Sequence, residues 1–397
     1  MNLDCIDSKE FNAFLEQYGS SDPIKLRLKK FSGLTFDLDF AITQISCRQK
    51  ARRKLPELGE RLIYPTAVSI EQCTAEPVAK LHGTLFAGCR NVYDLTCGLG
   101  IDAYYIAQNA RRLTCCDINP DVAATARHNF SRLGVTNIEA ECRDAVDASL
   151  NLGGYDACFV DPSRRGETAS TRLYSFADCT PHLQTIVDNI RSAVKFIVVK
   201  GSPMVDIAQT IKEYPETTDV WIVSVKNDCK ELLFKIDFTT SGTEPPMIHT
   251  INYESDRIET FATRYSANPE TPTYAHPQEG KHLLVPNASV MKSRQFSQLA
   301  EAYGIAKISP DTALFVGDAA VVDFPGKQYV VERILTMSKP DLKQLRTLYP
   351  AADITCRHFP LTPAELRKRL KINEGGNVHI YATTCYDNRH VLLVCRR

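Results

Sequence analysis

The sequence has 397 residues, which predicts two to four domains at roughly 100–200 residues per domain. Its 47 Lys and Arg residues balance 47 Asp and Glu residues, which excludes a protein whose whole surface is basic. A hydrophobic share of 44% and a charged share of 24% exclude global disorder and fibrous repeats.

The 14 cysteines form no C-x-x-C pair, so we expect free thiols in a reduced cytoplasmic protein and no metal site. The beginning of the sequence lacks the pattern of a signal peptide. No stretch approaches the roughly 20 apolar residues that cross a bilayer. We therefore expect neither secretion nor insertion into a membrane.

Residues 1–85 are expected to form a mostly helical region, because Phe11, Phe14 and Leu15 keep helical spacing. Between Lys25 and Lys54 the chain carries nine Lys or Arg residues and only two acids. Such a run is either a solvated face or a contact for a polyanion.

Residues 86–240 alternate between strand and helix signals. Apolar strands are predicted at 91–95, 112–117, 137–142, 155–160 and 195–200, with helices at 101–110, 121–133 and 183–193. This alternation predicts a doubly wound parallel α/β sheet. Strands at 219–225 and 231–237 have too short a link for a parallel crossover, so the sheet should end in an antiparallel pair.

The remaining chain is expected to form two small α+β domains, at 241–325 and 326–397. In the first, a strand is predicted at 281–285 and a helix at 296–303. In the second, a helix at 363–370 has Thr362 as its N-cap and Pro363 in its first turn. Its other predicted elements are strands at 329–334, 354–358, 378–384 and 390–396 and a helix at 339–345.

A glycine loop, Asp94-Leu95-Thr96-Cys97-Gly98-Leu99-Gly100, follows the first of the parallel strands and opens a helix. Its glycines allow a tight turn and close approach to a ligand, and the helix amides offer donors to an anion. The spacing to Ala103 and Asp117 also fits a dinucleotide site. Asp94 favours S-adenosylmethionine instead, because a carboxylate repels a diphosphate but attracts an ammonium or a sulfonium.

Acidic side chains follow four strands in series, at Asp94, Asp117, Asp144 and Asp161. Asp117 is suited to accept from ribose hydroxyls and Asp144 from the adenine amino group. Asp161-Pro162 follows the fourth strand, where the methyl acceptor is expected. A single such acid could be a helix N-cap or a solvated loop residue, but the series favours the cofactor.

Residues 91–240 thus resemble a class I S-adenosylmethionine-dependent methyltransferase. The resemblance implies a seven-stranded sheet of order 3-2-1-4-5-7-6 and cofactor contacts from Asp94, Thr96, Gly98, Gly100, Asp117 and Asp144. Residues 69–74 resemble the Glu-Gln-x-x-Thr segment that precedes the fold in several nucleic-acid methyltransferases. That likeness implies contacts from Gln72 and Thr74, although Thr74 also suits a helix N-cap.

Residues 286–292, 359–370 and 374–376 resemble a group of bacterial methyltransferase-like proteins with a ferredoxin-like domain, here at 241–325, and a THUMP-like domain, here at 326–397. THUMP domains in general bind RNA, usually tRNA. By analogy the resemblance implies an RNA partner, either tRNA or rRNA. Neither DNA nor a membrane is indicated.

The acceptor motif Asp161-Pro162-Ser163-Arg164-Arg165 keeps the Asp-Pro half of the motif in amino-methylating enzymes but lacks the stacking aromatic. It also resembles the Asp-Pro-Pro-Arg of uridine C5 methyltransferases, whose cysteine nucleophile is absent from Lys200-Gly201-Ser202-Pro203-Met204. The candidate catalytic residues are Asp161, which would orient or deprotonate the acceptor, and Pro162. Candidate substrate contacts, which ion pairs or solvated faces would also explain, are Arg164, Arg165, Lys200, Arg367, Lys368 and Arg369.

The sequence therefore favours an S-adenosylmethionine-dependent methyltransferase that acts on RNA by direct methyl transfer. Two alternatives stay open at this point. One is a methyltransferase for a protein or a small molecule. The other is a non-catalytic adaptor that binds S-adenosylmethionine or RNA.

Overall fold

The computed structural model describes residues 5–147, 150–164 and 175–396. The chain divides into two compact units. The first contains Met1–Thr218 and Leu233–Thr243, and the second contains Asp219–Leu232 and Glu244–Arg397.

The expected helices of the N-terminal region are confirmed. Its elements are α1 (Lys9–Tyr18), α2 (Pro23–Arg27), α3 (Leu38–Lys54), α4 (Ala67–Gln72) and α5 (Glu76–Thr84). The hydrophobic positions of α1 fix its packing, because Phe11, Phe14 and Leu15 are buried against Ile42 and Ile45 of α3. The acceptors at the N-caps of α1, α2 and α3 are the side chains of Ser8, Asp22 and Asp37.

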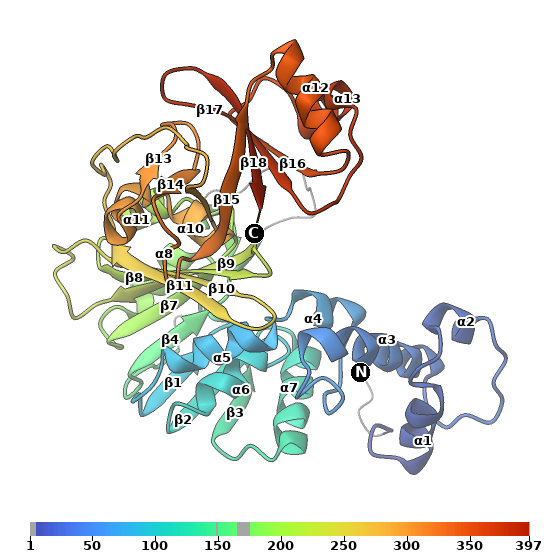
Figure 1. The fold of residues 1–397 in the computed structure, drawn as a ribbon. Coiled ribbons are helices and arrows are strands. Elements are labelled where there is room, and N and C mark those ends of the chain that lie inside the picture. The colour runs from blue at the N-terminus through green and yellow to red at the C-terminus, as the bar shows by residue number, and fades with distance from the viewer. Residues whose placement is uncertain (1–4, 148–149, 165–174, 397) are drawn as a thin grey trace. The chain divides into compact units, whose positions relative to one another are not determined.

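The predicted parallel sheet is also confirmed (Figure 1). Strands β1 (Asn91–Asp94), β2 (Arg112–Asp117), β3 (Ile138–Cys142), β4 (Ala157–Val160) and β7 (Phe196–Gly201) pair in the order β7-β4-β1-β2-β3. The helices between them are α6 (Ile101–Ala107), α7 (Pro120–Leu133) and α8 (Leu183–Ile190). Because the strands are parallel, their carboxyl ends meet at one edge of the sheet, where the strand-end acids gather.

The antiparallel end of this sheet follows the predicted order. After α9 (Ile207–Glu213), strands β8 (Thr217–Val225) and β9 (Asp228–Asp237) are joined by Lys226 and Asn227 at φ 52° and 61°. Two left-handed residues in a two-residue link form a tight hairpin turn. The order β8-β9-β7-β4-β1-β2-β3 is the methyltransferase order 6-7-5-4-1-2-3.

Two strands that the sequence did not predict extend the sheet to nine. Strand β10 (Met247–Tyr253) pairs in parallel with β8, and β11 (Ile258–Arg264) pairs antiparallel with β10. The Thr243-Glu244-Pro245-Pro246 segment before them had the composition of a domain boundary.

The second unit contains a seven-stranded sheet of order β13-β14-β12-β15-β18-β17-β16. Its strands are β12 (His282–Pro286), β13 (Ala306–Lys307), β14 (Phe315–Gly317), β15 (Gly326–Leu335), β16 (Asp353–Arg357), β17 (His379–Thr384) and β18 (His390–Arg396). Its helices are α10 (Ala288–Ser293), α11 (Phe296–Tyr303), α12 (Lys339–Leu348) and α13 (Pro363–Leu370). Helix α13 begins as predicted, with a capping box between Thr362 and Glu365.

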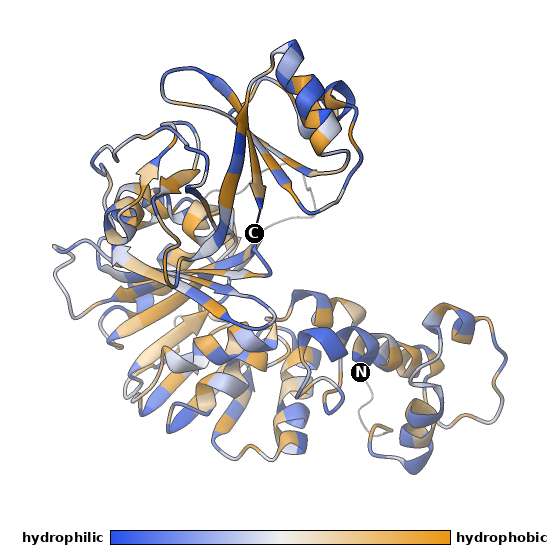
Figure 2. Ribbon diagram, in the orientation of Figure 1, coloured by the Kyte–Doolittle hydropathy of each residue, from blue (hydrophilic) through white to orange (hydrophobic). Residues whose placement is uncertain are grey.

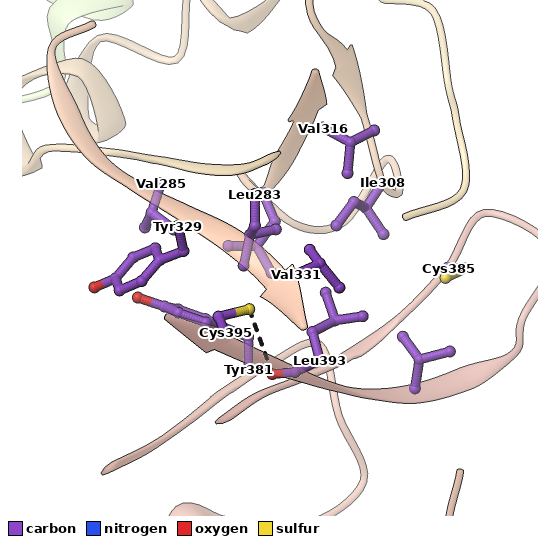
Figure 3. Packing of buried hydrophobic residues seen from close by; sticks show 12 residues of the cluster. Leu283, Val285, Ile308, Val316, Tyr329, Val331, Tyr381, Cys385, Leu393 and Cys395 are labelled. Atoms are coloured by element: carbon purple, nitrogen blue, oxygen red, sulfur yellow. Dashed lines mark hydrogen bonds between the residues drawn. The ribbon is translucent and has the colours of Figure 1, made fainter. Parts of the chain in front are cut away.

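One core serves both halves of this second sheet (Figure 3). Leu283 of β12 and Val316 of β14 pack with Tyr329 and Val331 of β15 and with Leu393 of β18. The strands at 282–317 and those at 326–396 therefore share one sheet and this hydrophobic cluster, while each half also packs against a cluster of its own. In Figure 2 the hydrophobic colours follow these strands, whereas α12 and α13 carry hydrophilic residues as well.

All 14 cysteines lie within the described residues, and none of them forms a disulfide there. Across the described ranges, no helix is both long and apolar enough to span a bilayer. Within the acceptor motif, β5 (Ser163–Arg164) pairs with β6 (Cys179–Thr180) in a short two-stranded sheet. A 3₁₀ turn at Phe176–Asp178 precedes β6.

Candidate active site

The glycine loop runs from the end of β1 to the beginning of α6. Gly98 and Gly100 have φ angles of +54° and +83°, in the left-handed region that favours glycine. A Cβ on Gly98 would meet no atom within 4 Å, whereas a Cβ on Gly100 would lie 2.6 Å from the Phe130 ring. Gly98 thus borders open space, and Gly100 allows the loop to pack against α7.

Alanine substitutions should separate these two roles. Gly100→Ala is expected to destabilise the protein by about 2–5 kcal/mol, because left-handed backbone strain adds to the clash with Phe130. Gly98→Ala should cost only about 1–2 kcal/mol of strain but weaken cofactor binding, because its methyl group enters the open space beside the loop. Urea unfolding and calorimetric titration with S-adenosylmethionine measure the two effects. Equal losses of stability in both variants would contradict this assignment.

Asp94 ends β1 and is fully buried. Its Oδ1 accepts from the Thr96 N–H at 2.9 Å, while its Oδ2 has no hydrogen-bond partner in the described part of the chain. Burial raises the pKa of Asp94 to about 8, against the opposing effect of the Thr96 N–H. A buried carboxylate oxygen without a donor is suited to a cationic group such as the ammonium of S-adenosylmethionine.

Asp117 lies at the end of the neighbouring strand β2 and is half-buried. Its Oδ2 accepts from the Gly98 N–H at 3.1 Å and its Oδ1 from the Asn119 N–H at 2.9 Å. Each oxygen keeps capacity for a further donor, as a ribose hydroxyl requires. Asp144 is exposed after β3 and accepts from the Val146 N–H at 3.0 Å.

A polar network joins the N-terminal helices to the acceptor motif. Thr74, which is buried between α4 and α5, donates to Asp102 Oδ2 at 2.7 Å. Lys200 near the end of β7 donates to Thr74 Oγ1 at 3.0 Å and to Asp161 Oδ2 at 2.6 Å. The Asp161 N–H donates to Thr96 Oγ1 at 2.7 Å, which connects the network to the glycine loop.

The sequence did not indicate His82 or Asp102. His82 of α5 is fully buried, and its Nδ1 lies 2.8 Å from Asp102 Oδ1. Burial alone would raise the pKa of Asp102, but His82, Lys200 and Thr74 together outweigh it and lower that pKa to about 2. The sequence did contain one signal for Asp102, which is an acidic residue two positions after the glycine loop. Because α6 begins at Ile101, this position faces α5.

Several predicted contacts lie elsewhere or cannot be placed. Gln72 ends α4 with an exposed side chain that makes no hydrogen bond to the described residues. Pro162 is buried beside Asp161. Arg164 belongs to β5, but its side chain, like the whole of Arg165, lies outside the described residues.

The basic residues of α13 differ in their contacts. Arg367 donates from Nη1 to the carbonyl oxygens of Ala352 and Asn373, both at 2.9 Å. These bonds tie α13 to the residue before β16 and to the segment after the helix, so they favour a structural role over a substrate contact for Arg367. Lys368 and Arg369 are exposed and make no ion pair with the described residues.

Three family models match the chain. They are a methyltransferase domain at residues 92–164, a ferredoxin-like domain at 282–325 and a THUMP domain-like family at 326–397. The matches place the glycine loop, Asp117, Asp144 and Asp161 within the methyltransferase domain.

Similar proteins agree with these matches. An uncharacterized S-adenosylmethionine-dependent methyltransferase of Mycobacterium tuberculosis is 26% identical over 86% of this chain and 95% of its own length. A crystal structure of a candidate methyltransferase from Porphyromonas gingivalis W83 is 28% identical, with a TM-score of 0.85 over 98% of this chain and 99% of that chain. A tRNA/tmRNA (uracil-C(5))-methyltransferase of Actinobacillus pleuropneumoniae is 23% identical over 44% of this chain and 54% of its own length.

The residues of the site also fit the cofactor of these proteins. Asp94 Oδ2 is a buried acceptor that finds no donor among the described residues, and the glycine loop leaves open space beside Gly98. The individual contacts of Asp94, Thr96, Asp117 and Asp144 with the cofactor stay predictions. The chain is a class I S-adenosylmethionine-dependent methyltransferase that carries a ferredoxin-like domain and a THUMP-like domain.

Proposed function

We propose that this methyltransferase acts on RNA, either tRNA or rRNA, by direct methyl transfer. The THUMP-like domain supports an RNA partner by analogy, and the partial relatives named as tRNA and 23S rRNA methyltransferases support the same substrate class. The structural observation that carries the proposal is a set of exposed basic residues on α2 and the turn after it, which have few acidic partners.

The cofactor supplies an electrophilic methyl group on a sulfonium sulfur. In our proposal Asp94 accepts from its ammonium, Asp117 from its ribose hydroxyls and Asp144 from its adenine amino group. Gly98 and Gly100 shape the loop beside it. Thr96 holds the backbone of Asp161, so that the cofactor loop and the acceptor motif are fixed together.

Covalent uracil C5 chemistry is not part of this proposal, because it needs a thiolate nucleophile. Cys73, beside Thr74, is half-buried, and burial raises its pKa to about 11. Its thiol therefore stays protonated at neutral pH. The residues that follow Lys200 as far as Met204 include no cysteine. The segment immediately after β7 therefore offers no thiol nucleophile either.

The N-terminal basic run contains cations of α3 that are held in ion pairs and exposed cations of α2 that have few such partners. On α3, Lys50 pairs with Glu71 at 2.6 Å and Arg52 with Glu60 at 3.1 Å. The basic residues of α2 and the turn after it are all exposed, and their single ion pair within the described residues joins Arg27 to Asp39 at 3.7 Å. These residues are Lys25, Arg27, Lys29 and Lys30, and we call them the α2 basic patch.

Unpaired exposed cations suit a phosphate backbone, because each contact releases counterions and adds to the salt dependence of binding. Lys368 and Arg369 on α13 offer a second, smaller group of the same kind. Lys50 and Arg52 of α3 are already paired with acids and are expected to contribute less.

The test is binding of full-length protein to fluorescently labelled tRNA and rRNA fragments at several salt concentrations. Replacing the four residues of the α2 basic patch with Gln should weaken binding at least tenfold and lower the salt slope by roughly 2–4. The matched control, Lys50→Gln with Arg52→Gln, should bind within about twofold of wild type because paired surface charges contribute little.

Methyl transfer from radiolabelled S-adenosylmethionine to total RNA, total protein and small-molecule extract completes the test. Label in RNA is expected. Label in protein or small molecules alone, or absence of RNA binding by the folded wild type, would overturn the proposal.

A further inference from the structure

Two of the segments that carry the resemblance to the ferredoxin-like and THUMP-like group come together beside one arginine. Arg357 is the last residue of β16, two positions before the 359–370 segment. Its Nη1 donates to Sδ of Met291 at 3.5 Å, and Met291 lies on α10 within the 286–292 segment. This contact joins the ferredoxin-like part to the THUMP-like part inside the second unit.

The guanidinium of Arg357 has few acceptors. A guanidinium carries five N–H donors, and a thioether is a weak acceptor. Arg357 is half-buried, yet its single hydrogen bond within the described residues goes to the thioether of Met291, and it forms no ion pair there. Most of its donors are therefore left to a group from outside the chain.

No nearby anion offsets the charge of this guanidinium. Burial lowers the pKa of Arg357, and the one side chain that opposes this effect is Tyr381. Burial also raises the pKa of Tyr381 well above its usual range, so this phenol is uncharged at neutral pH. The positive charge of Arg357 therefore stays uncompensated in the free protein.

Two other arginines of the THUMP-like domain have acceptors in the folded chain. Arg346 donates to one backbone carbonyl oxygen and Arg367 to two, all at 2.9 Å. Arg357 lacks such a partner, although partial burial of an uncompensated charge is unfavourable. A residue that breaks a packing rule without a gain in stability indicates a binding role.

The neighbouring segment favours a polyanion as the ligand. Residues 287–294 contain Lys292 and Arg294 but no acid. Arg294 follows Met291 by three residues, is exposed, and forms no ion pair with the described residues. The guanidinium fork matches the oxygens of a phosphate group, and a nucleic-acid strand presents one phosphate at every nucleotide.

We propose that Arg357 and Arg294 bind phosphate groups of the RNA backbone. This inference rests on the proposed action on RNA and places a contact in the second unit, whereas the α2 basic patch belongs to the first. The phosphate oxygens supply the acceptors that the Arg357 guanidinium lacks in the free protein.

Arg357→Met should weaken RNA binding without a loss of stability. Methionine keeps an unbranched apolar chain and removes the uncompensated charge, so the urea midpoint should stay at or above the wild-type value. Binding of the full-length variant to labelled tRNA and rRNA fragments should weaken at least fivefold, and the salt slope should fall by about 1. Arg294→Gln, at an exposed position, should weaken binding at least threefold with wild-type stability.

Arg346→Met is the matched control, because this arginine serves a carbonyl group of its own domain. Its urea midpoint should fall, since the carbonyl loses its donor, while its RNA affinity should stay within twofold of wild type. Inorganic phosphate at constant ionic strength distinguishes a free anion from RNA. It should leave the wild-type urea midpoint unchanged under conditions in which RNA raises that midpoint.

The outcomes separate this inference from the function on which it rests. Wild-type RNA affinity in Arg357→Met, or a fall in its urea midpoint as large as that of Arg346→Met, would overturn the phosphate site and leave action on RNA intact. Equal stabilisation by inorganic phosphate and by RNA would overturn the RNA backbone as its ligand. Absence of RNA binding by the folded wild type would overturn action on RNA and this site together.

Discussion

Asp94→Asn is expected to abolish S-adenosylmethionine binding and to stabilise the cofactor-free protein at alkaline pH. In our proposal the negative charge of the Asp94 carboxylate pairs with the positively charged cofactor ammonium. The amide that replaces the carboxylate is uncharged, so affinity should fall at least 100-fold. In the cofactor-free wild type, burial raises the pKa of Asp94 to about 8, far above the ordinary value of 3.8. Ionising this carboxyl at high pH therefore opposes folding.

The pH dependence follows from this raised pKa. Between pH 4 and pH 8 the folded protein keeps a proton on Asp94 that the unfolded chain releases, so stability falls as pH rises through this range. The full effect is on the order of 5 kcal/mol above pH 8. Because an unpaired buried amide costs about 1–3 kcal/mol, the net gain of the variant at pH 9 should be about 2 kcal/mol or more.

Urea unfolding of wild type and Asp94→Asn from pH 5 to pH 9, with and without S-adenosylmethionine, measures both effects. The wild type should lose stability with rising pH and recover it with the cofactor. The variant should show a flatter profile and no response to the cofactor. Cofactor binding of equal strength in the two proteins would contradict the role of Asp94.

His82→Leu is expected to destabilise the protein by about 3–5 kcal/mol, because it removes a main partner of a buried carboxylate. Asp102 is 14% exposed at its side chain, and His82 is prominent among the groups that hold its pKa at about 2. Combining His82→Leu with Asp102→Asn should recover more than half of the loss, because the uncompensated charge is gone.

Asp102 also predicts an acid dependence of opposite sign to that of Asp94. Its folded pKa lies below the ordinary value of 3.8, so its contribution is present above pH 4 and is lost as pH falls towards 2. Urea unfolding from pH 2 to pH 7 should show this loss in wild type but not in Asp102→Asn. A loss below 1 kcal/mol in His82→Leu at pH 7 would contradict the importance of the pair.

Features that depend on neighbouring residues in the chain were predictable from the sequence. The glycine loop and the strand-end acids Asp94, Asp117 and Asp161 follow apolar runs, and parallel strands bring their carboxyl ends to one edge. The short link expected at residues 226–230 predicted the hairpin, because so few residues cannot form a parallel crossover. In the structure the link is shorter still and consists of Lys226 and Asn227.

Features that depend on long-range packing were not predictable. His82 and Asp102 lie on different helices, and no periodicity reports their contact. Strand β10 pairs with β8 across an intervening hairpin and follows two prolines that suggested a boundary. Arg367 looked like a substrate contact, but its donors are used by two carbonyl groups that only the folded chain brings near it. The boundaries at residues 85, 240 and 325 stay predictions.

The cofactor site is tested most directly by calorimetric titration of the wild-type protein with S-adenosylmethionine at pH 7, in two buffers of different ionisation enthalpy. We expect binding to one site with release of close to one proton, because Asp94 must ionise to accept the ammonium. Absence of binding by the folded protein would contradict the assigned cofactor site. Binding without proton release, at equal strength in Asp94→Asn, would contradict the role of Asp94 within it.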